Sequence, residues 1–300
     1  MLEYPTLDSL FSTHFDAWGV ARIEPIEDEI DRLKEWIGNG YHAEMQYMAR
    51  NIELRANPCE LLPDAQSMIM VLMNYYPHEW QPDNLPQIAA YAYGNDYHHI
   101  VKSKLTQIAE EINKIAPHKY AVFCDSAPVM ERTWAVRAGL GWIGRNGMLV
   151  NPKLGTFTFI GTLITTLELE PSRPMENRCG TCKKCIEACP TGAILGNKTI
   201  DARRCLSYQT IEKRGDIDNE LIDLAGNTLY GCDRCQLACP WNRFAKPHNH
   251  PELMQIDGIF NLDWASITRS EFNNRLKFSP MQRAGLKKIK SRYNQITTNS

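Results

Sequence analysis

The sequence predicts an α+β protein in three parts. Helical and strand-like patterns alternate through the first part, as they do in α/β and α+β domains. Eight of the ten cysteines gather in a short second part, between Cys179 and Cys239. The third part reads as short helices only. We therefore expect three units, which span residues 1–170, 171–245 and 246–300.

Each element of the first part rests on its own hydrophobic pattern. Leu7, Leu10, Phe11 and Phe15 recur at helical spacing, whereas the run from Ser67 to Tyr75 is apolar throughout and typical of a buried strand. The same criteria predict, in chain order, a helix (6–18), a strand (19–23), a helix (26–37), a strand (67–75), a helix (97–115), a strand (120–124), a helix (130–138) and a strand (156–167). The long third helix begins after Asn95 or Asp96, either of which suits an N-cap.

Composition excludes some classes of function. The chain has 300 residues, 43% of them hydrophobic and 23% charged, which is ordinary for a soluble globular protein. The longest purely apolar run, Met68 to Met73, is far shorter than the roughly 20 residues of a membrane span. The N-terminus lacks a basic region followed by an apolar run, so we expect a cytoplasmic protein without a membrane partner, acting as a monomer. A net charge of −2 gives no overall attraction to nucleic acid.

The C-terminal segment departs from this balance. Residues 276–300 carry six basic side chains and no acidic one: Lys277, Arg283, Lys287, Lys288, Lys290 and Arg292. Such a segment is either the solvated face of a helix or a surface that contacts phosphates.

The cysteine spacing indicates iron–sulfur clusters. The first run reads Cys-x2-Cys-x2-Cys-x3-Cys-Pro, which is the bacterial ferredoxin spacing, and a second run ends in Cys-x2-Cys-x3-Cys-Pro. In this pattern the first three cysteines of a run bind one 4Fe–4S cluster and the fourth binds the other cluster. The predicted ligands of cluster one are Cys179, Cys182, Cys185 and Cys239, and those of cluster two are Cys189, Cys205, Cys232 and Cys235.

Structural zinc and disulfide bonds are the alternatives to two clusters. Zinc sites stop at four ligands for each metal, which does not explain two runs that end in Cys-Pro. Disulfides require an oxidising compartment, which the missing export signal argues against.

About 170 residues precede the clusters, so we expect the electrons to reach a site in that first part. The letters Gly139-x-Gly141-x-x-Gly144 match a dinucleotide motif, but they follow a helix rather than a strand. The stretch from Asp96 to His99 is similar to a histidine motif that ligates cobalamin, but Val101 stands at its glycine position.

Six segments together resemble the epoxyqueuosine reductase family. Three lie in the cysteine-rich part: CGTCKKCIEACPTGA (179–193), RRCLSY (203–208) and YGCDRCQ (230–236). Three lie upstream: GNDYH (94–98), DSAPVMER (125–132) and AGLGWIGRN (138–146). The cysteine pattern alone occurs in many ferredoxin-like domains, whereas its combination with the upstream segments is specific to this family.

The resemblance implies a cobalamin-dependent enzyme with two 4Fe–4S clusters. Its corrinoid-binding α/β core is expected to be similar to that of reductive dehalogenases and to be followed by a ferredoxin-like two-cluster domain. The implied reaction removes the epoxide oxygen of epoxyqueuosine at the wobble position of tRNA, with an external electron donor. A reductive dehalogenase and an electron-transfer protein without its own substrate are the open alternatives.

The family's proposed proton donor matches Asp125. We expect its pKa to be raised by apolar neighbours, with Val122, Phe123 and Pro128 as candidates, so that it can protonate the alkoxide left by the opened epoxide. The alternative is that Asp125 caps the helix predicted at 130–138.

Further site residues are implied by the resemblance. Those expected to contact the corrinoid are Arg55, Asp125, Arg132, Trp142, Asn146, Leu149, Ile160, Ser207, Asp233 and Arg234. Of these, Arg55 could meet a propionamide or the nucleotide phosphate. Lys213 and Arg214, together with the basic C-terminal segment, are the candidates for contact with tRNA.

Overall fold

A four-stranded antiparallel sheet organises the first half of the chain. The structure is a computed structural model that describes residues 4–298. The strand order is β1 (Ala17–Arg22), β2 (Ser67–Asn74), β7 (Thr158–Thr165) and β4 (Tyr120–Phe123). Every residue of β2 is buried, because this central strand is covered on both faces. Its side chains alternate between the faces, with Ile69, Val71 and Met73 on one and Met68, Met70 and Leu72 on the other.

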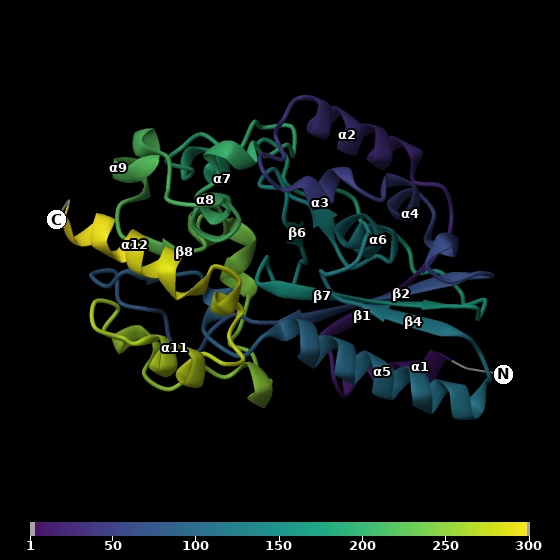
Figure 1. Cartoon of the computed structure of the whole chain (residues 1–300). Coiled ribbons are helices and arrows are strands. Elements are labelled where there is room, and N and C mark those ends of the chain that lie inside the picture. Colours follow the sequence, from purple (N-terminus) through teal and green to yellow (C-terminus); the bar gives the residue numbers. More distant parts are fainter. Residues whose placement is uncertain (1–3, 299–300) are drawn as a thin grey trace.

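Helices cover both faces of the sheet (Figure 1). One face packs against α1 (Tyr4–Ser12) and α5 (Tyr97–Ile115), and the other against α6 (Glu131–Arg137). The other face also carries α2 (Glu27–Gly38), α3 (Gln46–Ala49) and α4 (Ile52–Ala56). Helix α5 approaches β7 closely, because Gly161 has no side chain: a Cβ there would lie 2.5 Å from Cγ1 of Val101.

The cysteine-rich part is made of short elements. It contains α7 (Lys184–Glu187), α8 (Leu206–Ile211), α9 (Ile222–Ala225) and α10 (Arg234–Leu237). Strand β8 (Thr228–Tyr230) runs parallel to β3 (Gln87–Ile88), which joins this part to the first half, and a hairpin of β5 (Trp142–Ile143) and β6 (Leu149–Val150) lies nearby. The 3₁₀ helices are Pro58–Glu60, Ala90–Ala92, Ala202–Arg204, Asn219–Leu221, Pro240–Phe244, Pro251–Leu253, Ile259–Asn261 and Pro280–Arg283.

The C-terminal segment belongs to the hydrophobic core. It contains α11 (Arg269–Arg275) and α12 (Gly285–Thr298), and its buried apolar residues extend the cluster formed by α1 and α5. Among them, Leu276, Met281 and Ile289 are fully buried. The three-part division remains a prediction, although this packing shows that the segment is no free tail.

The basic residues of the C-terminal segment mostly contact protein. Arg292 is buried and donates hydrogen bonds to the carbonyl oxygens of Thr228, at 2.8 Å, and of Gly226. Arg283 forms a bidentate pair with Glu212, at 2.9 and 2.7 Å. The expected choice between a solvated face and a phosphate-binding face is therefore wrong for Arg292, because its guanidinium is used to fix neighbouring backbone.

The predicted elements agree with the structure except near the N-terminus. The helix at 97–115 and the strand at 67–75 are confirmed to within a residue. The first helix ends at Ser12 rather than at residue 18, because Trp18 belongs to β1. The Trp18 ring folds back onto this helix: it stacks on Phe11, with ring centroids 5.0 Å apart, and its Nε1 donates to Asp8 Oδ1 at 2.9 Å. Asp96 is the N-cap of α5. Among residues 4–298, no helix is both long and apolar enough to cross a membrane.

Candidate active site and cluster sites

The structure brings the eight cysteines into two groups of four. Cys179, Cys182, Cys185 and Cys239 line one cavity of about 220 Å³. Burial raises the pKa of Cys239, and the nearby thiols of Cys179, Cys185 and Cys182 raise it further. This first group opens on the surface beside the exposed Arg178 and Arg243.

The second group joins Cys235 with Cys205, Cys232 and Cys189. Burial raises the pKa of Cys235 well above its ordinary value, and these three thiols raise it further. Each group thus takes the last cysteine of one run together with cysteines of the other, as the ferredoxin spacing requires. All ten cysteines are free of disulfide bonds. Two groups of four thiols match the four ligands that each of two 4Fe–4S clusters requires. Which cysteine binds which cluster remains a prediction.

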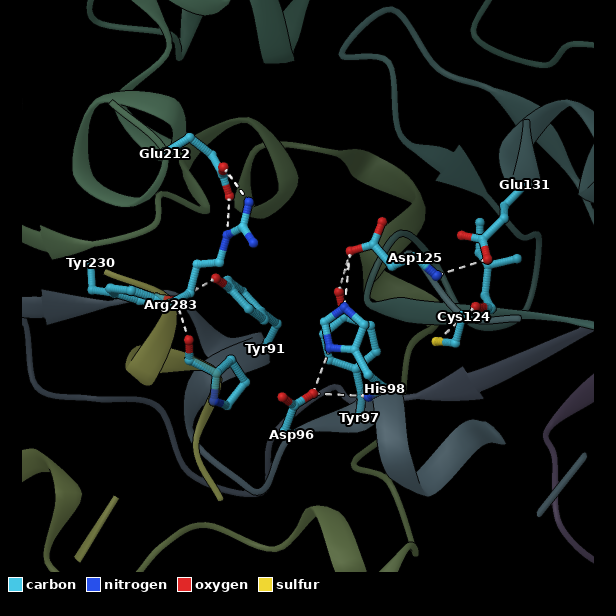
Figure 2. A network of polar contacts seen from close by, with 12 residues as sticks. Tyr91, Asp96, Tyr97, His98, Cys124, Asp125, Glu131, Glu212, Tyr230 and Arg283 are labelled. Carbon is cyan, nitrogen blue, oxygen red and sulfur yellow. Dashed lines mark hydrogen bonds and ion pairs between the residues drawn. The ribbon is translucent and has the colours of Figure 1, made fainter. Parts of the chain in front are cut away.

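A second polar constellation lies at the N-terminus of α5, where Asp125 meets Tyr97 and His98 (Figure 2). The Tyr97 hydroxyl donates to Asp125 Oδ2 at 2.6 Å, and His98 Nε2 lies 3.5 Å from the same oxygen. On its other side, His98 Nδ1 lies 2.5 Å from Asp96 Oδ1. Tyr97 is fixed by stacking on Phe159 of β7, with ring centroids 3.9 Å apart.

The surroundings of Asp125 and His98 give these two side chains opposite charges. Burial lowers the pKa of His98, but the Asp125 and Asp96 carboxylates outweigh that effect and raise it to about 9. Burial raises the pKa of Asp125, but hydrogen bonds from His98 and Tyr97, with the charges of His98 and Arg132, lower it to about 2. At neutral pH, Asp125 is therefore a carboxylate and His98 an imidazolium ion.

The expectation of a raised pKa for Asp125 is therefore wrong. The apolar neighbours in sequence do not decide it, because α5 delivers two hydrogen-bond donors from elsewhere in the chain. The Asp125 side chain is nevertheless 61% exposed, so burial removes only part of the water around the carboxylate and does not outweigh the hydrogen bonds. Sequence reasoning missed Tyr97 and His98 as partners, since it considered the histidine only as a metal ligand; the GNDYH segment was the available signal.

Glu131 is the other residue that sequence reasoning missed. It is the first residue of α6, and its Oε1 accepts a hydrogen bond from the backbone N–H of Asp125 at 2.8 Å. Burial and the charge of Asp125 raise the pKa of Glu131 to about 8. The helix-capping alternative for Asp125 is wrong, because the N-cap of α6 is Met130, without a side-chain hydrogen bond.

Arg55 carries a buried donor nitrogen that has no acceptor within residues 4–298. Only 8% of the residue is exposed, and one terminal nitrogen donates to the Tyr47 carbonyl oxygen at 3.3 Å. Among the described residues, no hydrogen-bond acceptor serves Arg55 Nε. Because a buried unpaired donor is costly, this nitrogen fits a bound acceptor such as an amide or a phosphate. The site therefore fits the expected corrinoid on this point.

Two family matches together contain the cysteine groups and the polar site around Asp125. Residues 178–242 match the family described as a 4Fe-4S double cluster binding domain, and residues 55–126 match the family described as epoxyqueuosine reductase QueG, DUF1730. The curated epoxyqueuosine reductase of Leadbetterella byssophila is 41% identical over 278 residues, which is 92% of each chain. That of Cellulophaga algicola is also 41% identical, over 91% of this chain and 92% of its own.

The chain belongs to the epoxyqueuosine reductase family.

Solved structures of epoxyqueuosine reductases share the whole fold. One from Streptococcus thermophilus gives a TM-score of 0.90 at 27% identity, and covers 100% of this chain and 82% of its own. One solved with an epoxyqueuosine-modified stem loop of tyrosine tRNA gives 0.87 at 28% identity, over 97% and 79%. The catabolic reductive dehalogenase NpRdhA gives 0.52 at 15% identity in one structure, over 98% and 35%. The expected likeness of the fold to reductive dehalogenases is thereby confirmed.

Several predicted corrinoid contacts of this epoxyqueuosine reductase family member already have protein partners. Asp233 accepts from the Ala90 N–H at 2.7 Å and from Gln236 Nε2 at 2.8 Å. Arg234 donates to the carbonyl oxygens of Leu224 and Ala225 in α9, both at 3.0 Å. These bonds give both side chains a structural role, so direct contact with the corrinoid stays a prediction.

The remaining predicted contacts differ in burial and in the partners that they have within the protein. Trp142 is buried edge-on against Trp241, and its Nε1 has no partner among the described residues. Asn146 Nδ2 donates to the Cys235 carbonyl oxygen at 3.4 Å. The others are the exposed Arg132 near Asp125, the buried Leu149, the half-buried Ile160 and Ser207 in α8.

The two residues predicted to contact tRNA differ in the protein contacts that their side chains already make. Lys213 Nζ donates to the Asp216 carbonyl oxygen and to Asp218 Oδ1, both at 2.7 Å. Arg214 is exposed, and its backbone N–H donates to Glu44 Oε2 at 2.9 Å. Arg214 is thus the better placed of the two to meet a phosphate.

Proposed function

We propose that this chain reduces epoxyqueuosine to queuosine at the wobble position of tRNA. The observation that supports it most strongly is that the two family matches contain both constellations. Residues 55–126 include Arg55, Tyr97, His98 and Asp125, and residues 178–242 include all eight grouped cysteines. The relative solved with a modified stem loop supports the choice of substrate. The expected cytoplasmic location and the tRNA partner belong to this proposal.

The side chains of this protein contribute one proton to the reaction, at the oxygen of the opened epoxide. Opening an epoxide leaves an alkoxide, and a general acid with a pKa near or above neutrality suits that task. In the observed geometry the available proton is on His98, whose Nε2 faces Asp125 Oδ2 at 3.5 Å. We propose that His98 transfers its proton to the Asp125 carboxylate as Asp125 passes that proton on to the alkoxide, which leaves His98 neutral and Asp125 a carboxylate again. Tyr97 holds the carboxylate in place meanwhile.

The cofactors are proposed to lie between these groups. Cobalamin, when bound, supplies a low-valent metal centre, and the two clusters supply single electrons. Arg55 Nε would bind an acceptor on the corrinoid, and Asn146 and Trp142 would line the same pocket. One relative, from Bacillus subtilis, was solved with its catalytic loop swung out of the active site. We infer that the loop carrying Asp125 is the equivalent moving part here.

The first cysteine group is the proposed entry point for electrons. It lies at the surface, with Arg178, Lys183, Lys184 and Arg243 exposed around it and Glu176 and Glu187 as the nearby acids. The second group lies next to a cavity of about 170 Å³ that Ala90 and Phe159 line, since Asp233 between its cysteines accepts a hydrogen bond from the Ala90 N–H. An acidic one-electron carrier suits the basic rim.

The entry point can be tested with an acidic flavodoxin as the probe. Replacing Lys183 and Lys184 by serine should slow cluster reduction by the flavodoxin and flatten its salt dependence. Reduction by dithionite, a small anion, should change little. Equal effects on both reductants would contradict a docking surface at this rim.

The decisive experiment for the function is a single-turnover assay. The chain is reconstituted anaerobically with iron, sulfide and cobalamin, reduced, and mixed with a stem loop that carries epoxyqueuosine. Formation of queuosine, identified by mass spectrometry of the digested RNA, is the expected result. A protein that binds and reduces its cofactors without converting the RNA would overturn the proposal; debromination of a bromophenol would favour the dehalogenase alternative. Failure to bind cobalamin at all would favour an electron carrier.

A further inference from the structure

Asp125 is held in an unusual backbone conformation. Its φ of 56° lies in the left-handed region, which residues other than glycine seldom adopt. It stands two residues after the end of β4, an edge strand of the sheet, and starts a loop that runs to Met130. A strained residue at the start of a loop requires surrounding contacts that keep it in place.

The contact that does so comes from Glu131. Its Oε1 receives the Asp125 N–H at 2.8 Å, so the loop is closed by a bond between its first part and the helix that follows it. Figure 2 shows this bond on the side of Asp125 away from His98. The anchor is rigid, because Trp134 and Ala135 of α6 are fully buried against the sheet. Glu131 thus connects the loop to the core.

We propose that Glu131 is a positioning residue that latches the 124–130 loop. By accepting the Asp125 N–H, it keeps the Asp125 carboxylate directed at Tyr97 and His98, where the proton is exchanged. This inference rests on the proposed function for its catalytic consequence. The latch itself is a property of the free protein and can be measured without any reaction.

The chemistry of the latch explains the choice of residue. Only a carbonyl-type oxygen is required, so a glutamine can replace the glutamate, whereas leucine of similar size cannot. A charged carboxylate here would repel Asp125, but burial keeps the Glu131 carboxyl largely protonated at neutral pH. Glu131 is then a neutral acceptor beside a charged neighbour.

The test compares Glu131→Gln with Glu131→Leu in the reconstituted holoenzyme. The matched control is Glu27→Leu, which removes an exposed glutamate from the first turn of α2. The measurements are hydrogen–deuterium exchange of the peptide that covers 124–130, single-turnover deoxygenation of the stem loop at saturation, and affinity for that stem loop. Iron content, the corrinoid spectrum and the melting temperature report whether each variant is folded and loaded.

We expect Glu131→Leu to lose exchange protection in the loop and to turn over roughly 10- to 100-fold more slowly, the range for losing one buried hydrogen bond. Its stem-loop affinity and cofactor content should be unchanged. Glu131→Gln should stay within about 3-fold of wild type in both protection and rate, since the amide oxygen accepts the same bond. Glu27→Leu should match wild type.

Two results would overturn the latch. The first is a folded Glu131→Leu protein with wild-type loop protection and rate. The second is a Glu131→Gln protein as impaired as the leucine variant, which would mean that the acid itself is required. If Glu131→Leu fails to fold, the glutamine variant still decides between these two roles. If wild type itself does not convert the RNA, the proposed function fails, while the exchange data still test the latch.

Discussion

Asp96 should control the pH at which the enzyme loses activity. Asp96 Oδ1 lies 2.5 Å from His98 Nδ1, and with Asp125 it raises the pKa of His98 to about 9. Asp96→Asn removes one of these two charges while asparagine still caps α5. The expected consequence is a lower pKa for His98, between its ordinary value near 6.5 and about 9.

The size of the effect follows from the protonated fraction of His98. At pH 8.5, a histidine with a pKa of about 9 is roughly three-quarters protonated, whereas one at about 6.5 is only ~1% protonated. The rate lost in Asp96→Asn at that pH is therefore bounded at about 75-fold, and we expect ~5- to 50-fold because Asp125 remains. At pH 6 both proteins carry a protonated His98 and should agree within about 2- to 3-fold.

The same shift affects stability with a defined sign. A pKa raised in the folded state contributes stability that is fully present below the ordinary pKa near 6.5 and is lost as pH rises through about 9. Wild type should therefore lose more stability than Asp96→Asn between these two pH values.

The assay is single-turnover deoxygenation of the modified stem loop from pH 6 to 9.5. His98→Gln serves as the comparison that lacks the group entirely, and His99→Gln, at an exposed neighbouring histidine, is the matched control. Corrinoid and cluster spectra are recorded on the same samples. An alkaline limb at the same pH in wild type and Asp96→Asn would refute the role given to His98.

Three further predictions test other parts of the structure. Cys205→Ala should lower iron from about eight to about four per chain, since two 4Fe–4S clusters are expected and only the second needs this thiol; iron analysis that matches wild type would place the ligand elsewhere. Asp125→Asn should keep its cofactors and slow deoxygenation by about 10²- to 10⁴-fold if proton transfer limits the step; turnover near wild type would remove Asp125 from the chemistry. Arg292→Met should destabilise the fold by roughly 2–3 kcal/mol in urea unfolding, because two carbonyl oxygens lose a charged donor. The salt dependence of stem-loop binding should not change in Arg292→Met, and a smaller slope would return this residue to the RNA surface.

Sequence patterns predict the elements that depend on local periodicity. Helix α5 and strand β2 are long and strongly patterned, so their positions follow from the order of apolar and polar residues alone. The cysteine spacing likewise predicts which thiols meet, because a ferredoxin run has one way to distribute its ligands.

What the sequence could not predict depends on contacts between distant segments. His98 meets Asp125 only because α5 and β4 lie side by side on β7, so the sign of the Asp125 pKa shift was predicted wrongly. The C-terminal segment was predicted from its charges alone. Its apolar residues, such as Met281 and Ile289, are fully buried and decide where it packs.

The position of Arg292 has a consequence for how the protein is made. This side chain in the last helix binds the backbone at Gly226 and Thr228, within the stretch that separates Cys205 from Cys232. Those carbonyl oxygens obtain their charged donor only after α12 has been synthesised and has packed against them. We therefore expect the second group of thiols to reach its final arrangement only once α12 has docked, so that insertion of its cluster follows the folding of this distant segment.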